Sequence, residues 1–168
     1  PCSTWRSPKR LISPRTPTVT TLSRDWIAAV GRDHAFAGVR WESCQPVTMT
    51  TLDELIARHG MPAFCKIDVE GYELEVLQGL SQPIPALSFE YISICLDRAR
   101  ACVARLAVLG YDQFNWSVGE SHRLRSADWL GAEQMLARIE TLGATGRSGD
   151  IYARLQAGVS GVVGGNGR

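Results

Sequence analysis

The feature that most limits the fold of this chain is an alternation of short apolar runs with helical patterns, which begins near residue 51. Glycine and proline separate the segments, so that each is long enough for only one strand or one helix. Strands that alternate with helices favour an α/β domain with a largely parallel sheet. The predicted helices are 51–59, 72–78, 97–109 and 127–142, and the predicted strands are 64–68, 86–92, 111–116 and 150–155.

Residues 1–46 lack this alternation and are predicted to be an irregular connecting segment. Prolines interrupt the first twenty residues, although 22–30 can form a short helix with Ser23 as its N-cap. The body of the domain is placed at 47–156. Residues 157–168 are expected to be a disordered tail, because they are rich in glycine and poor in large apolar side chains.

The composition and charge of the 168 residues exclude several classes of protein. A formal net charge of +1, from 18 basic and 17 acidic residues, argues against a nucleic-acid binder that depends on a strong basic field. No apolar run approaches the roughly 18 residues that a membrane span needs. The five cysteines form no C-x-x-C pair, so neither a disulfide framework nor a zinc site is expected, and a cytoplasmic location is predicted.

The run from Lys66 to Glu73 places acidic side chains where a strand ends and a helix begins. Strand side chains alternate, so Lys66 and Asp68 lie on one face of the strand, and Gly71 provides the turn. Open α/β sheets bind ligands beyond the carboxyl ends of their strands, which is where Asp68 and Glu70 are expected. The plainer interpretation is that the two acids only stabilise the start of the following helix.

Glu90 is a third candidate, because it follows Ser88-Phe89 in a strand rich in apolar residues. A carboxylate in such a strand needs a partner or a ligand, and a salt bridge to Lys66 would also be sufficient. Asp68, Glu70 and Glu90 could together hold a divalent cation through their oxygens, but strand-end acids need no metal, and none is predicted.

Histidine offers the usual alternative bases, and each has a simpler interpretation. His59 is predicted in the last turn of a helix, where a partly charged imidazole suits the helix dipole. His122 lies in a polar loop and is expected to be exposed, and His34 has no supporting neighbours.

Several runs in the chain, taken together, resemble the second half of the FkbM family of methyltransferases. The central run is Lys66-Ile-Asp-Val-Glu-Gly-Tyr-Glu-Leu-Glu-Val-Leu-Gln-Gly79, and its order and flanking helix make it specific. The resemblance covers roughly residues 47–155, the C-terminal portion of such a domain. The other matching runs are Thr50–Ile56, Leu87–Glu90, Leu109–Tyr111 and Gly149–Ala153.

The resemblance implies a class I, Rossmann-like methyltransferase with a doubly wound sheet of seven strands, which uses S-adenosylmethionine to methylate a hydroxyl oxygen of a sugar, glycan or natural product. Residues 64–68 would then be the fourth strand and 87–91 the fifth. The last two strands, 111–116 and 150–155, are expected to pair antiparallel at one edge. Three catalytic roles are predicted: Asp68 first and Glu70 second as the carboxylate that accepts the proton, and Glu90 to orient the substrate or Lys66.

The chain departs from the family in the half that binds the cofactor. Class I methyltransferases have a strand, a glycine-rich turn and an acidic residue that binds ribose, and nothing before residue 47 fits this pattern. The cluster Gly161–Gly165 has no helix after it. The cofactor-binding residues are therefore unknown, and we expect a partial domain that binds S-adenosylmethionine poorly by itself. The alternative is a non-catalytic partial domain or interaction module.

Overall fold

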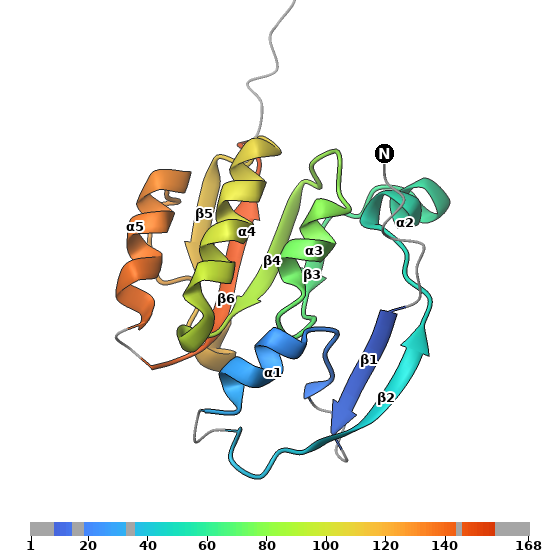
Figure 1. Ribbon diagram of the computed structural model, residues 1–168. Coiled ribbons are helices and arrows are strands. Elements are labelled where there is room, and N and C mark those ends of the chain that lie inside the picture. The colour runs from blue at the N-terminus through green and yellow to red at the C-terminus, as the bar shows by residue number, and fades with distance from the viewer. Residues whose placement is uncertain (1–8, 15–18, 33–35, 144–145, 157–168) are drawn as a thin grey trace, which may run out of the picture.

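The computed structural model describes residues 9–14, 19–32, 36–143 and 146–156, which form two sheets and five helices (Figure 1). The strands are β1 (Lys9–Pro14), β2 (Trp41–Val47), β3 (Cys65–Ile67), β4 (Ala86–Tyr91), β5 (Gln113–Trp116) and β6 (Gly149–Arg154). The helices are α1 (Arg24–Val30), α2 (Leu52–His59), α3 (Glu73–Gln78), α4 (Leu96–Val108) and α5 (Ala132–Leu142), with short 3-10 turns η4 (Ser93–Cys95) and η5 (Gly119–Ser121). His34 and the predicted tail 157–168 lie outside the described residues.

The main sheet has the strand order β3-β4-β6-β5, and it confirms the predicted α/β, Rossmann-like fold and the antiparallel pairing of the last two strands. β3 runs parallel to β4, whereas β6 is antiparallel to both β4 and β5. β3, β4 and β5 therefore point in one direction, as expected of a largely parallel sheet, and β6 alone is reversed between β4 and β5. Apolar patterns identify strands but not their directions, so the reversal of β6 was expected only from the resemblance to the family.

The core of the main sheet lies under α3, α4 and α5, which cover the same face (Figure 1). Leu87 and Phe89 of β4 pair with Ala153 and Ile151 of β6, and all four side chains are almost completely buried. The apolar stripe of α4 is buried against this layer. Its buried members are Ala99, Cys102, Val103 and Leu106.

The first 46 residues, predicted to be irregular, contain regular structure. β1 and β2 form an antiparallel two-stranded sheet, and Pro14 is tolerated because it ends β1, where the register is irregular. The predicted short helix is confirmed as α1, since Ser23 accepts a hydrogen bond from the backbone N–H of Trp26. Trp26 packs edge-on against Trp41 of β2, with ring centroids 6.0 Å apart.

Local sequence predicts the start of α2 correctly but not that of α5. α2 begins as predicted, with the Thr51 hydroxyl accepting from the backbone N–H of Glu54 at 3.1 Å. α5 begins at Ala132 rather than near residue 127, because Leu130 and Phe114 exchange two backbone hydrogen bonds of 2.8 Å. The pairing with β5 outweighs helical preference there. Among the described residues, no helix is long and apolar enough to span a membrane.

Candidate functional site

The turn between β3 and α3 is shaped by Gly71, which has φ +84°. A Cβ atom at this position would lie 2.6 Å from the Trp26 Cβ and closer still to its Cγ and Cδ1. Glycine is therefore required twice, for its backbone conformation and for the approach of the indole. As a result, Trp26 of α1 is 2% exposed and lies directly against the turn that carries the acidic residues.

Glu70 precedes this glycine and has φ +49°, an uncommon conformation for a residue with a side chain. The buried hydroxyl of Thr21 holds it there by donating a 2.6 Å hydrogen bond to the Glu70 carbonyl oxygen. On the other side of the turn, the Gly71 N–H donates to the Glu73 carboxylate at 2.9 Å. Strained backbone that is fixed by its surroundings is typical of functional sites.

The three carboxylates predicted from the sequence meet in the structure. Asp68 and Glu70 follow β3, and Glu90 lies near the end of the parallel neighbour β4. One carboxylate oxygen from each residue lies within 4.8 Å of the other two. We call Asp68, Glu70 and Glu90 the acidic cluster. Its position at the carboxyl ends of β3 and β4 agrees with the rule for open α/β sheets, whereas the catalytic roles of its members stay predictions.

Lys66 makes its ion pairs with Asp150 and Asp68. Its Nζ lies 2.7 Å from Asp150 Oδ1 and 3.5 Å from Asp68 Oδ2. Burial alone would lower the Lys66 pKa, but the hydrogen bonds and charges of the two aspartates outweigh it, so the Lys66 pKa is raised. Asp150, which faces Glu90 in the β4–β6 register, was not among the residues expected from the sequence. Only knowledge that β6 lies beside β4 could have revealed it.

Two members of the acidic cluster hold protons unusually tightly. Burial, and then the negative charges of Asp68 and Glu73, raise the pKa of Glu70 from 4.5 to about 7. Burial, and then the charges of Glu70 and Asp68, raise the pKa of Glu90 from 4.5 to about 8. Carboxylates with such pKa values are typical of functional sites, although structural networks also produce them.

The described histidines lie outside the acidic cluster. His122 is exposed, as predicted, with its Nδ1 3.7 Å from Asp150 Oδ2 and its Nε2 3.7 Å from Glu120 Oε2. His59 lies in the last turn of α2, also as predicted. The geometry therefore favours the carboxylates over the histidines as the chemical groups of this site.

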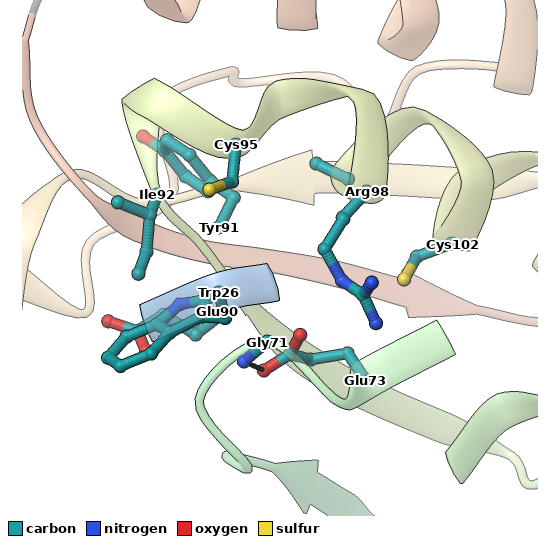
Figure 2. Close-up of a pocket in the computed structure, with 10 residues that line it drawn as sticks. Trp26, Gly71, Glu73, Glu90, Tyr91, Ile92, Cys95, Arg98 and Cys102 are labelled. Atoms are coloured by element: carbon teal, nitrogen blue, oxygen red, sulfur yellow. Dashed lines mark hydrogen bonds between the residues drawn. The ribbon is translucent and has the colours of Figure 1, made fainter. Parts of the chain in front are cut away.

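A small cavity lies beside the acidic cluster, between α1, β4 and α4 (Figure 2). Its volume of about 20 Å³ is enough for about one water molecule. Two buried donors, Trp26 Nε1 and Arg98 Nε, have no hydrogen-bond partner there. The full lining is Trp26, Gly71, Glu73, Glu90, Tyr91, Ile92, Cys95, Arg98, Ala99 and Cys102.

The mixed sheet, with helices on one face and acidic residues at the carboxyl ends of β3 and β4, defines a Rossmann-like α/β domain. The family model of the methyltransferase FkbM domain matches residues 15–101, and the chain belongs to this family. The match begins earlier than residue 47, where the resemblance was expected to begin, and it includes α1, β2 and the acidic cluster. Comparisons with curated proteins and with solved structures found no match.

Proposed function

We propose that this domain transfers a methyl group from S-adenosylmethionine to a hydroxyl oxygen of a small molecule or glycan, with the acidic cluster on the acceptor side. The observation that supports the proposal is the meeting of Asp68, Glu70 and Glu90 at the strand ends of a chain from the FkbM family. A cytoplasmic location stays a prediction from the cysteine content.

The acceptor hydroxyl must lose its proton as the new bond to the methyl carbon forms. A carboxylate within hydrogen-bond reach can take that proton and contribute roughly 10²–10⁴-fold to the rate. We assign this role to Asp68, because its side chain is 54% exposed and can meet an incoming hydroxyl. The side chains of Glu70 and Glu90 are more buried than that of Asp68 and would orient the acceptor.

Lys66 has a positioning role in this proposal. Its ammonium lies between Asp150 and Asp68, and Asp150 is only 5% exposed. A buried carboxylate needs a partner to stay charged, so Asp150 holds Lys66, and Lys66 in turn fixes the direction of the Asp68 carboxylate. The acceptor would meet a base whose orientation is set before binding.

The cavity beside the acidic cluster is too small for S-adenosylmethionine. Pockets for molecules of that size have volumes of about 300–1,000 Å³, whereas the cavity beside the acidic cluster measures about 20 Å³. We therefore assign no residue of this chain to the methyl donor.

The test follows methyl-labelled S-adenosylmethionine and a panel of glycosides and simple alcohols, with calorimetry to measure donor binding separately. Because this chain is expected to bind the donor weakly, the donor is supplied at high concentration; we expect slow, acceptor-dependent transfer that falls by about 10²-fold or more in Asp68→Asn. Asp97→Asn, which changes a fully exposed acid on α4, is the matched control. Near-normal transfer in Asp68→Asn would rule out its role as base, and absence of both donor binding and transfer would refute the proposal for this chain.

A further inference from the structure

We propose that the acidic cluster binds one divalent cation of the class that prefers oxygen ligands, such as Ca²⁺, Mn²⁺ or Mg²⁺. The sequence predicts no metal here, and the arrangement of the three carboxylates changes that expectation. The inference goes beyond methyl transfer, because cation binding needs neither a methyl donor nor an acceptor.

The spacing of the carboxylate oxygens fits a single ion. Oxygen ligands lie about 2.3–2.6 Å from Ca²⁺, so oxygens on opposite sides of the ion are about 4.6–5.2 Å apart. One oxygen each from Asp68, Glu70 and Glu90 lies within 4.8 Å of the others. All three can therefore reach one Ca²⁺ with small side-chain rotations, and Mg²⁺, at about 2.0–2.1 Å, requires them to move closer.

The charges around the acidic cluster leave a deficit that a divalent ion would fill. Lys66 is the cation nearest to Asp68, at 3.5 Å, and it makes a shorter contact of 2.7 Å with Asp150. Arg98, across the small cavity, is paired with Glu75 of α3. Within the described part of the chain, the positive charge of Lys66 therefore compensates only part of the negative charge of the three carboxylates.

The indole of Trp26 supplies an independent sign that an oxygen atom belongs at this place. Its ring is 2% exposed and its Nε1–H has no partner, although an unsatisfied buried donor costs about 1–3 kcal/mol. The indole lines the same cavity as Glu90 (Figure 2). The missing partner must be a hydrogen-bond acceptor.

A hydrated cation provides such an acceptor. Three carboxylates occupy only part of the coordination shell of Ca²⁺ or Mg²⁺, and water or another oxygen fills the remaining positions. An oxygen held by the ion on the cavity side would accept from Trp26 Nε1–H, and the cavity of about 20 Å³ has room for about one such molecule. The carboxylates on one side would bind the cation, and the Trp26 Nε1–H on the other side would donate to a water molecule bound to that cation.

The experiment uses Tb³⁺, a luminescent ion with the ligand preference of Ca²⁺, excited through tryptophan. Titrations are run in about 0.15 M salt to screen scattered surface acids, and Ca²⁺ and Mg²⁺ serve as competitors. We expect saturable binding of one ion. Glu70→Gln and Glu90→Gln should each weaken Tb³⁺ and Ca²⁺ binding by about tenfold or more, since each removes one of three charged ligands.

Two controls locate the ion. Asp97→Asn removes an exposed acid outside the acidic cluster and should leave the affinity unchanged. Trp26→Phe removes the nearest indole and should lower the sensitised Tb³⁺ emission at saturation. In the unaltered chain, Ca²⁺ should raise the thermal midpoint and EDTA should reverse the rise.

Three outcomes would overturn the proposal. The first is the absence of saturable Tb³⁺ binding. The second is an affinity of Glu70→Gln and of Glu90→Gln that equals the affinity of the unaltered chain. The third is the absence of a Ca²⁺-dependent rise of the thermal midpoint in the unaltered chain. In the first and third cases the Trp26 donor is satisfied by water alone. Because no methyl donor is present, failure of cation binding leaves the proposed methyl transfer standing, and the reverse also holds.

Discussion

Replacing Gly71 with alanine tests how closely the acidic turn depends on Trp26. The new Cβ would have φ +84° and would lie 2.6 Å from the Trp26 Cβ, and closer still to two other atoms of that side chain. The left-handed backbone costs about 1–2 kcal/mol, and inserting a methyl group into a packed contact costs about 1–3 kcal/mol. The sum is a loss of about 2–5 kcal/mol in the free energy of unfolding.

Gly110→Ala separates these two contributions. Gly110 has φ +98°, and a Cβ there would meet no atom within 4 Å, so only the backbone cost of about 1–2 kcal/mol should appear. Urea unfolding followed by circular dichroism measures both variants. For a chain of this size each kcal/mol corresponds to about 2–4 °C in the thermal midpoint, and Gly71→Ala should lower that midpoint by about 4–20 °C.

A double variant completes the test. Trp26→Ala removes Cγ and Cδ1, two of the three atoms nearest to the new methyl group. The combined variant Trp26→Ala, Gly71→Ala should therefore lose about 0.5–3 kcal/mol less than the sum of the single losses. If Gly71→Ala is no less stable than Gly110→Ala, or if the two changes simply add, the indole does not press on the turn and the reasoning is wrong.

Three further predictions concern the surroundings of the site. Lys66→Met should lower the free energy of unfolding by about 2–3 kcal/mol, because the buried Asp150 loses its 2.7 Å partner while part of the Lys66 side chain is exposed; an unchanged urea midpoint would contradict this. Tyr111→Phe should cost about 1–3 kcal/mol, since the phenol bonds both the N–H and the carbonyl of Ile84. Burial raises the pKa of Tyr111 from 10 to about 12. The stabilising contribution of the neutral phenol is therefore fully present below pH 10 and is lost as the pH rises towards 12. The difference in free energy of unfolding between the unaltered chain and Tyr111→Phe should be smaller at pH 11.5 than at pH 9. Cys102 is 1% exposed and burial raises its thiol pKa, so iodoacetamide should label it only at the rate of unfolding at pH 8, and fast labelling of the folded chain would refute this.

The acidic cluster could be predicted from the sequence because one rule about strand ends applies to all three residues. Asp68 and Glu70 follow an apolar run, and Glu90 ends the next one, so knowing that the two strands are neighbours was enough to bring the residues together. The prediction needed no detail of packing.

Asp150 and Trp26 could not be found in this way. Asp150 is 84 residues from Lys66, and their contact depends on β6 entering the sheet between β4 and β5. Trp26 lies in the short helix predicted over residues 22–30, but its contact with Gly71 depends on how α1 packs. Long-range contacts of this kind leave no local pattern to recognise.

The position of β6 also has a consequence for synthesis of the chain. Within the described sheet β6 is the only strand that pairs with β5, yet 32 residues, 117–148, separate the two strands in sequence. At about 5–20 residues per second, a ribosome needs about 2–6 s to make that stretch. During this interval the nascent β5 carries Phe114 and Trp116 with no strand beside it, and a chaperone that binds exposed aromatic segments would meet the chain at this stage.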